Sequence, residues 1–455
     1  MGKVNSIDHN AVSHVIEPIA AEYVSTKQPT SRRKPLAGVY MALLLFMFIY
    51  CARPEDWIPG LSNAPLAKFT VILAVLALVF SLRHIRQRLP REIIFLFLLI
   101  GQLFLAAVIS PVWRDGAFQV TLEFAKVFLI VLVMTVAVNT SKRLRRLIFI
   151  QAASVAVIAI VDVWKGHLLL GRLNGILRGI YADPNDMALA IVISLPLCLA
   201  LLFLTRNRAW KVLWAIFMLV MTFAVFLTGS RSGLLTLIVV ATVCLWEFAI
   251  RGRRRYLLAL VALVGVILWQ FSSGMLVGRL NGTFNPQEDT AAAYGSAQQR
   301  LQLFWRSIEV TKEHLFFGVG PGNFDIVSGS WHTTHNSFTL MSSEGGVPAL
   351  ILYVSILWCG FKNLRAAEQF ARSQPESRVL ARALLASLVG FVVGSLFLSV
   401  AYQFFPYILV AYTTALFSIA RASAIHSKRD KQSPQRITSV NFYSAIETIG
   451  VSPGR

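Results

Sequence analysis

The chain has 455 residues, of which 56% are hydrophobic and only 14% are charged. Soluble proteins carry about 25% charged residues, so this composition indicates a membrane protein. The net charge of +21 alone would suit nucleic-acid binding, but the Lys and Arg residues stand in short clusters between apolar runs. Basic clusters beside apolar runs set the orientation of membrane helices, and we predict no nucleic-acid partner.

Several apolar runs along the chain approach the roughly 20 residues that a helix needs to cross a bilayer. We predict one membrane helix in each of these runs: Leu36–Cys51, Leu66–Leu82, Glu92–Ile109, Phe118–Val138, Leu144–Val163, Asp186–Leu204, Trp210–Leu227, Ser232–Ile250, Tyr256–Phe271, Val347–Phe361, Val379–Val400 and Gln403–Ala420. A start near Ser337 is also compatible with the tenth run. The predicted fold class is an all-α integral membrane protein with about 12 transmembrane helices.

Clusters of Lys and Arg occupy every second gap between these runs. They include Arg83–Arg91, Lys142–Arg146, Arg206–Lys211, Arg251–Arg255 and Lys362–Arg382. Since positive charge marks the cytoplasmic side, we predict that both termini are cytoplasmic and that the other gaps face outward. The chain then divides into a polar cytoplasmic tail (1–35), a multi-pass membrane domain (36–420) and a disordered cytoplasmic tail (421–455).

The outward gap between the ninth and tenth runs spans about residues 272–344 and is too long for a simple connection. Within it, the spacing predicts a helix over Ala291–His314 that lies at the membrane surface. The residues that would share one face of this helix are Leu301, Phe304, Trp305, Ile308 and Thr311.

His335 stands in "HTTHNSFTLMSSEGG", where the chain leaves this loop and enters the tenth run. It is either an interfacial polar residue at a helix end or a functional base, because a neutral imidazole accepts a proton from a hydroxyl group. On a continuous helix, Thr339 and Ser342 would share its face, whereas Glu344 would point away unless the Gly–Gly pair that follows breaks the helix. His332 is the weaker candidate, since it sits in the loop.

Arg231 stands in "TGSRSG", a short turn between the seventh and eighth runs. The turn itself explains the glycines and serines, but not the arginine. An arginine at the mouth of a helical bundle extends its guanidinium group to lipid phosphate or binds a phosphorylated ligand. Both interpretations stay open.

Two arginines, Arg172 and Arg178, stand in "RLNGILRGIYADPND" before the sixth run. The acids of this segment have a structural interpretation, with Asp183 as N-cap, Pro184 at the first helical position and Asp186 in the first turn. A metal site at the two acids is the less favoured alternative. Capping does not need the arginines, and two of them in an outward gap suggest an anionic ligand.

Arg300, in "AQQRLQLFW", is a further outward arginine. It is either a solvated residue on an amphipathic helix or part of the same anion site. The sequence contains no GxxxxGK[ST], HExxH or GxSxG motif and no zinc-ligand spacing. ATP-driven transport and metalloprotease activity therefore lose support.

Outward arginines beside a histidine at the mouth of a membrane bundle suit one chemistry. The arginines would stabilise the charge that develops on a pyrophosphate as it leaves a lipid-linked sugar. His335 would orient or deprotonate an acceptor hydroxyl group. The phosphoanhydride of the donor supplies the driving force, so we expect no cofactor.

Four segments together resemble the O-antigen ligase and O-antigen polymerase family of bacterial inner-membrane glycosyltransferases. They are "RLNGILRGIYADPNDMALA", "TGSRSGLLTL", "AQQRLQLFWRSIEV" with "GVGPGNF", and "HNSFTLMSSEGGVPALIL". They extend over about residues 172–352, and the layout of the apolar runs extends the likeness over most of the chain.

The resemblance implies a metal-independent transfer of glycan from undecaprenyl pyrophosphate to the lipid A core, a growing polysaccharide or a protein. It places the histidine of the family on His335, and it places the pyrophosphate-binding arginines on Arg172, Arg231 and Arg300, with Arg178 as a competitor for Arg172. Structural roles beside the site are implied for Asp183, Asn185, Asn336, Gly345 and Gly346.

Two details modify the resemblance. Ala349 stands where some members carry another glycine. The segment "ARPEDWIPGLS" resembles members associated with exopolysaccharide or protein-glycan export, which adds polysaccharide-export proteins as expected partners.

Two other functional classes compete with glycosyl transfer. A transporter or flippase would use the same arginines to bind a lipid pyrophosphate without chemistry. The missing internal repeats and the scarcity of acids within the apolar runs disfavour it. A scaffold in a polysaccharide-export complex would need none of the outward residues individually. Ligase and polymerase activities are not separated by the sequence.

Overall fold

The computed structural model describes residues 36–58, 60–61, 64–81, 89–169, 172–174, 181–271, 291–371 and 374–425. The predicted N-terminal tail lies outside the described residues, as does the C-terminal tail beyond residue 425 and the first part of the large loop. The described chain is built almost entirely from helices, which is consistent with an all-α membrane protein.

A helix occupies each of the predicted apolar runs. These helices are α2 (Ala37–Ala52), α4 (Leu66–Phe80), α5 (Arg91–Ile109), α6 (Arg114–Ala137), α7 (Ser141–Lys165), α8 (Pro184–Leu204), α9 (Arg208–Leu227), α10 (Arg231–Cys244) with its π-helical continuation η3 (Leu245–Ile250), α11 (Tyr256–Phe271), α15 (Ser337–Phe370), α16 (Pro375–Ser395) and the C-terminal helix Phe404–Ile425. Within the described residues, 9 helices are long and apolar enough to cross a membrane. The helices α2, α4 and α11 are shorter, so the full number of spans and their orientation stay predictions.

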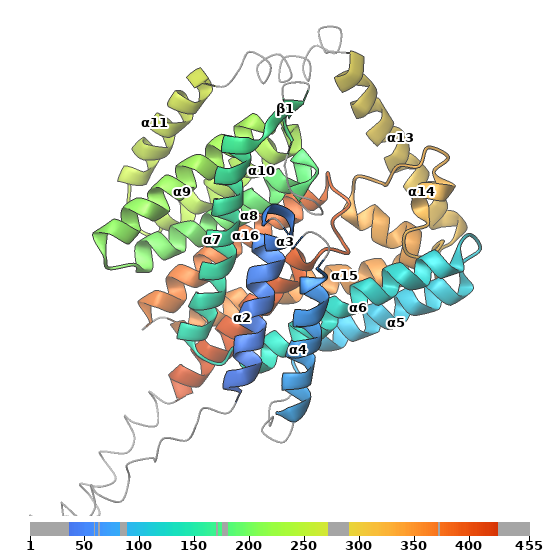
Figure 1. Cartoon of the computed structure of the whole chain (residues 1–455), viewed down its shortest axis with the longest axis horizontal. Helices are drawn as coiled ribbons and strands as arrows, with labels where there is room; N and C mark the ends of the chain where they lie inside the picture. The colour runs from blue at the N-terminus through green and yellow to red at the C-terminus, as the bar shows by residue number, and fades with distance from the viewer. Residues whose placement is uncertain are drawn as a thin grey trace, which may run out of the picture.

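Helix α8 is the central element of the bundle. In its most apolar window 78% of the residues are buried, more than in any other candidate span of the described chain. It packs against α16, α9 and α7, and Figure 1 shows these helices around it. The residues that begin α8 are therefore held in place by the core of the protein.

A two-stranded antiparallel hairpin, β1 (His167–Leu169) and β2 (Arg172–Asn174), precedes α8. The sequence prediction contained no strand here. The pairing sets Leu169 opposite Arg172, which fixes the backbone of the first candidate arginine beside the end of α7. The hairpin is the one departure from an all-helical description among the described residues.

Helix α15 bends sharply inside the membrane-entry segment. Gly346 has φ of 79°, and a Cβ atom at this position would lie 2.3 Å from the carbonyl oxygen of Phe316. The chain after α13 crosses this bend, because Gly320 N–H donates to Glu344 O and Val347 N–H donates to Leu315 O, both at 2.9 Å. Only glycine tolerates this close backbone approach.

The predicted loop helix is present as α13 (Ala291–Glu313), followed by the short α14 (Phe324–Val327). Two residues of the predicted apolar face are exposed, which is compatible with the expected position of this helix at the membrane surface. Leu303, Ser307 and Val310 are buried, whereas Leu301 and Trp305 are more than half exposed. The reason is that α13 packs on the first part of α15 through small polar contacts, which turns the larger apolar side chains outward.

Figure 1 shows α13 and α14 together at one end of the bundle, with α14 beside the connection between α5 and α6. The contact is made by Asn323, whose amide donates to Ser110 Oγ at 2.8 Å and to Trp113 O at 3.2 Å. The Ser110 hydroxyl group in turn donates to Val319 O at 2.6 Å. These bonds fasten the described part of the large loop to the helical bundle.

Candidate functional site

His335 lies in a tight turn immediately before α15. Its φ of 52° is in the left-handed region, which few residues other than glycine and asparagine adopt. The turn is closed by Thr334, whose hydroxyl group donates to Asn336 O at 2.7 Å and accepts from Asn336 N–H at 3.2 Å. Strained backbone of this kind persists only where the surrounding structure holds it.

Asn336 is the N-cap of α15 and ends the turn. Its Oδ1 accepts hydrogen bonds from Phe338 N–H at 2.9 Å and Thr339 N–H at 3.1 Å. The structural role expected for Asn336 is therefore a capping role. It also corrects one expectation, because His335 is not part of the helix and does not share a helical face with Thr339 and Ser342.

The connection between α16 and the C-terminal helix holds this turn in place through hydrogen bonds. Thr333 donates to Ser399 Oγ at 2.9 Å, and Asn336 Nδ2 donates to Leu396 O at 3.1 Å. Ser337 Oγ donates to Leu398 O at 2.6 Å and accepts from Val400 N–H at 2.9 Å. The sequence analysis did not single out this connection, although polar residues just before the last apolar run could have indicated it.

Arg300 and Asp183 approach His335 from two other parts of the chain. The pKa of His335 is lowered to about 4, mainly by burial and also by the charges of Arg300 and His332, whereas Asp183 acts to raise it. Because these charges act on the imidazole group, residues from α13, from the start of α8 and from the turn before α15 share one site. The imidazole is neutral at pH 7.

Arg300 is the most isolated cation of this site. Burial lowers the pKa of Arg300; Asp183 raises it and Arg231 lowers it. Its Nε atom is buried, and within the described part of the chain it has no hydrogen-bond partner. A buried donor without a partner is costly, so an arginine in this state is prepared to bind an anion.

Arg231 reaches the site at the first position of α10. Ser230 caps this helix by accepting from Gly233 N–H at 3.1 Å. A Cβ atom on Gly233 would lie 2.7 Å from the Cβ of Ala188, so α10 and α8 are in close contact at this point. The "TGSRSG" turn thus fixes the start of α10 against the start of α8.

Asn185 joins this turn to Arg172. Its Oδ1 accepts from Ser230 Oγ at 2.7 Å and from Arg172 Nη2 at 3.1 Å. Arg172 Nε also donates to Thr228 O at 2.9 Å. Arg172 is therefore fastened to the backbone on which Arg231 is mounted, and Asn185 has the structural role expected for it.

Asp183 caps α8, as the sequence predicts. Its Oδ1 accepts from Asn185 N–H at 2.7 Å and from Asp186 N–H at 3.3 Å, and Pro184 is the first helical residue. Asp186 accepts a hydrogen bond from Gln403 Nε2 at 3.2 Å, which links the start of α8 to the connection between α16 and the C-terminal helix. The two acids therefore have separate partners.

Glu344 is not a partner of His335. Its carboxylate accepts from Tyr402 OH at 2.8 Å and from Phe324 N–H at 3.3 Å, and the residue is 1% exposed. The bend at Gly346 follows directly after Glu344 and exposes the backbone carbonyls that receive the chain after α13. Glu344 therefore links α15 both to the segment after α13, through Phe324, and to the connection between α16 and the C-terminal helix, through Tyr402.

Gly345 has a packing role at the same bend. A Cβ atom there would lie 2.6 Å from the Cβ of Ala349 and 2.8 Å from Leu103 Cδ2. His332 lies in the loop, with Nδ1 2.5 Å from Ser330 O. Arg178, the competitor of Arg172, lies outside the described residues.

Residues 216–354 match the family model described as O-antigen ligase. This part of the chain is similar to O-antigen ligases. The match includes Arg231, Arg300 and His335, whereas Arg172 and Asp183 precede it. It confirms the resemblance to the O-antigen ligase and polymerase family and supports a membrane glycosyltransferase that acts on a lipid-linked glycan. No curated protein matches the chain.

Proposed function

We propose that the protein transfers a glycan from undecaprenyl pyrophosphate to an acceptor on the periplasmic face of the inner membrane. The acceptor is the lipid A core, a growing polysaccharide or a protein, so the activity is that of an O-antigen ligase or a polysaccharide polymerase. The observation that carries this proposal is the meeting of Arg231, Arg300 and His335 at one site, although they are far apart in sequence.

The pyrophosphate of the donor binds to Arg300 and Arg231. The charge of Arg231 lowers the pKa of Arg300, so the two cations are close enough to repel each other, and a dianionic group relieves that repulsion. The partnerless Nε of Arg300 gives the first hydrogen bond. As the glycosidic C–O bond breaks, negative charge grows on the leaving pyrophosphate, and fixed guanidinium groups stabilise it without a metal ion.

Arg172 holds the turn that carries Arg231. It does so through its hydrogen bonds to Thr228 O and Asn185 Oδ1, both of which lie next to the start of α10 or α8. Arg178 remains an alternative to Arg172 as a direct ligand of the pyrophosphate.

His335 receives the proton of the acceptor. Its pKa of about 4 keeps the imidazole neutral before the donor binds, but makes it a weak base. A bound pyrophosphate would offset the charge of Arg300 and raise the pKa of His335 toward the working pH. The acceptor hydroxyl or amine group then attacks the anomeric carbon, its proton passes to the imidazole, and the pyrophosphate leaves with the electron pair of the broken C–O bond.

The competing function is transport of a lipid-linked glycan. It uses the same arginines and no base, so it predicts that His335→Ala has a smaller effect than loss of Arg300. Glycosyl transfer uses the base in its chemical step, so it predicts that His335→Ala lowers the rate of that step by about 10²–10⁴-fold. A scaffold in an export complex predicts no effect for either substitution.

Mass spectrometry of undecaprenyl-linked glycans in a strain carrying His335→Ala tests the proposal. Long polymer on the lipid carrier would identify a ligase, and single repeat units would identify a polymerase. His314→Ala, at the end of α13 in the same loop, serves as the matched control and should leave the glycans unchanged. Unchanged glycans in the His335→Ala strain, with the variant present in the membrane, would refute the catalytic role.

A further inference from the structure

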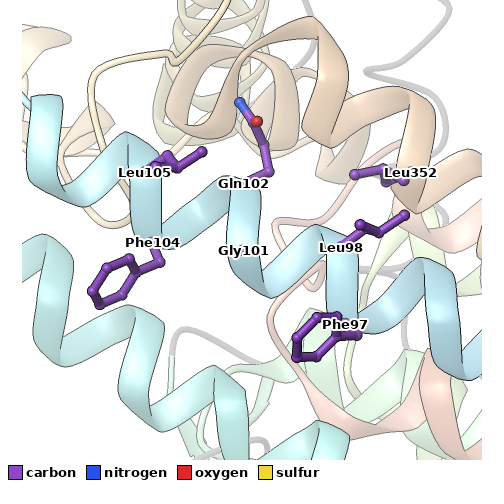
Figure 2. Close-up of a pocket in the computed structure, with 7 residues that line it drawn as sticks. All are labelled: Phe97, Leu98, Gly101, Gln102, Phe104, Leu105 and Leu352. Atoms are coloured by element: carbon purple, nitrogen blue, oxygen red, sulfur yellow. The ribbon is translucent and has the colours of Figure 1, made fainter.

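A pocket of about 540 Å³ opens on the outer surface of the bundle between α5 and α15. Its lining is apolar apart from one amide and includes Phe97, Gly101, Gln102, Phe104, Leu105 and Leu352. Figure 2 shows that the α5 side chains point to both sides of that helix, with Leu352 of α15 facing it. Phe97 is 63% and Phe104 47% exposed, so the pocket opens to the surroundings of the helices.

Gln102 closes the pocket at its polar edge. Its Nε2 donates to Phe316 O at 2.7 Å and to Gly345 O at 2.9 Å. Both hydrogens of the amide group are thus used by the backbone at the bend of α15. What the pocket offers to a ligand is hydrocarbon surface, and the chemistry that fits it is a hydrocarbon chain.

The bend of α15 connects this pocket to the charged site. Arg300 lies within α13 and His335 lies just before α15, and the two helices are in contact further along, where Thr311 Oγ1 lies 2.9 Å from Ser342 Oγ. Arg300 and Thr311 are separated by roughly 16 Å along a helix. The bend of α15 comes a few residues after Ser342, where Gly345 O accepts the hydrogen bond from Gln102 of the pocket.

We propose that the pocket holds the hydrocarbon chain of the same lipid whose pyrophosphate binds at Arg231 and Arg300. The inference rests on the proposed function. A cationic site and an apolar pocket joined by one packed pair of helix segments match an amphiphile with an anionic head and a long chain. A short-chain analogue with the same head would fill the cationic site without reaching the pocket.

The pocket contributes mainly packing and orientation. Bilayer lipid is as apolar as the pocket, so little hydrophobic free energy is gained when a chain moves from one to the other. Contacts with Phe97, Phe104 and Leu352 give dispersion energy that a mobile bilayer chain lacks. We therefore expect a preference for long chains that is moderate in size.

Gly101 allows a substitution that fills the pocket without disturbing the fold. A Cβ atom on Gly101 would have no neighbour within 4 Å, and the same holds for Gly265 on the exposed surface of α11. Leucine is a better helix former than glycine, so both helices should tolerate it. Gly101→Leu blocks the pocket, and Gly265→Leu is the matched control.

The test measures dissociation constants of the purified full-length protein for three probes with the same head: undecaprenyl pyrophosphate, farnesyl pyrophosphate and inorganic pyrophosphate. The wild type should bind the undecaprenyl probe at least about tenfold more tightly than the farnesyl probe. Gly101→Leu should reduce that preference by about tenfold and leave the two shorter probes unchanged. Gly265→Leu should change none of the three.

An unchanged chain-length preference in Gly101→Leu would overturn the inference, and so would an equal weakening of all three probes. Dioleoyl phosphatidic acid provides the remaining arm. If it displaces the undecaprenyl probe from the wild type with equal affinity, and Gly101→Leu removes that competition, the occupant is an ordinary membrane lipid. The proposed function fails separately, when Arg300→Ala leaves the binding of inorganic pyrophosphate unchanged.

Discussion

The two ends of α10 carry similar charged residues in opposite electrostatic situations. At the far end, Glu247 is paired with Arg251 at 3.1 Å and with Arg382 at 3.4 Å, and Glu368 lies 3.0 Å from Arg251. At the near end, Arg231 and Arg300 repel each other beside Asp183, whose Oδ1 is occupied by backbone N–H groups. In the first cluster each arginine has a carboxylate within salt-bridge distance, whereas at the near end the buried Nε of Arg300 has no hydrogen-bond partner among the described residues.

This difference separates a structural cluster from a binding site. Paired charges at the far end join η3, α15 and α16, and a buried ion pair of this kind is costly to break but needs no ligand. An unbalanced cationic group is retained at a cost to stability, which a bound anion would offset. Each prediction below changes one of the two ends or the structure that holds them.

Among the substitutions that compare the two ends of α10, removal of Arg300 has the largest expected effect. Because Arg300→Ala removes a fixed donor to the leaving group, glycan transfer should fall by about 10²-fold or more, and affinity for inorganic pyrophosphate should fall with it. Transfer by purified, reconstituted protein measures this effect.

Arg306→Ala provides the control for Arg300 on the same helix. Arg306 lies 3.1 Å from Glu309 and 3.6 Å from Glu313, so its charge is already balanced at the surface. Its removal should change transfer by less than about twofold. If Arg306→Ala and Arg300→Ala lose transfer activity equally, the position of Arg300 has no special importance for activity.

Gly346→Ala tests whether the near end depends on the bend of α15. The new methyl group would meet Phe316 O and occupy a backbone conformation with φ of 79°, so we expect a loss of at least about 2 kcal/mol in the free energy of unfolding. Thermal unfolding in detergent gives the comparison with Gly265→Ala, which has open space around it. Unfolding of both variants at the wild-type temperature would contradict the close packing at the bend.

Glu247→Gln weakens the far end without touching the near one. Two arginines lose their shared carboxylate, and because Arg251 is half exposed, solvent screening limits the cost to about 1–2 kcal/mol of stability. Transfer per folded molecule should stay within about twofold of wild type, since the proposed site is at the other end of the helix. A loss of activity larger than the loss of folded protein would show that the far end also contributes to transfer, against this expectation.

The smallest expected effect is a shift in the titration of His335. Arg300 lowers the pKa of this imidazole, which is about 4 in the wild type, and so Arg300→Gln should raise it. Nuclear magnetic resonance of histidine-labelled protein follows the titration. A pKa that stays the same or falls would show that the two residues do not share a site.

The sequence predicted best what depends on neighbouring residues. Apolar runs predicted the helices, and Asp183 with Pro184 predicted the start of α8, because capping is a local property. The start near Ser337 that the sequence left open for the tenth run is where α15 begins, with Asn336 as its N-cap, whereas the left-handed backbone of His335 was not predicted. The burial of Leu303 and Val310 on α13 depends on tertiary packing and was not predicted.

Long-range relations could not be read from one sequence. Nothing in "AQQRLQLFW" states that Arg300 lies beside Arg231 and His335, or that Arg172 binds the carbonyl group of Thr228. The sequence also does not show that Ser399 bonds to Thr333 and Thr334, which are more than 60 residues away. Local patterns identified the participants, and the fold decided which of them meet.

Donor binding and transfer measured side by side in purified His335→Ala test the central claim most directly. If His335 is the base and the arginines hold the donor, this variant should bind undecaprenyl pyrophosphate with an affinity close to wild type while its rate of glycan transfer falls by about 10²–10⁴-fold. Transfer at the wild-type rate would contradict the account.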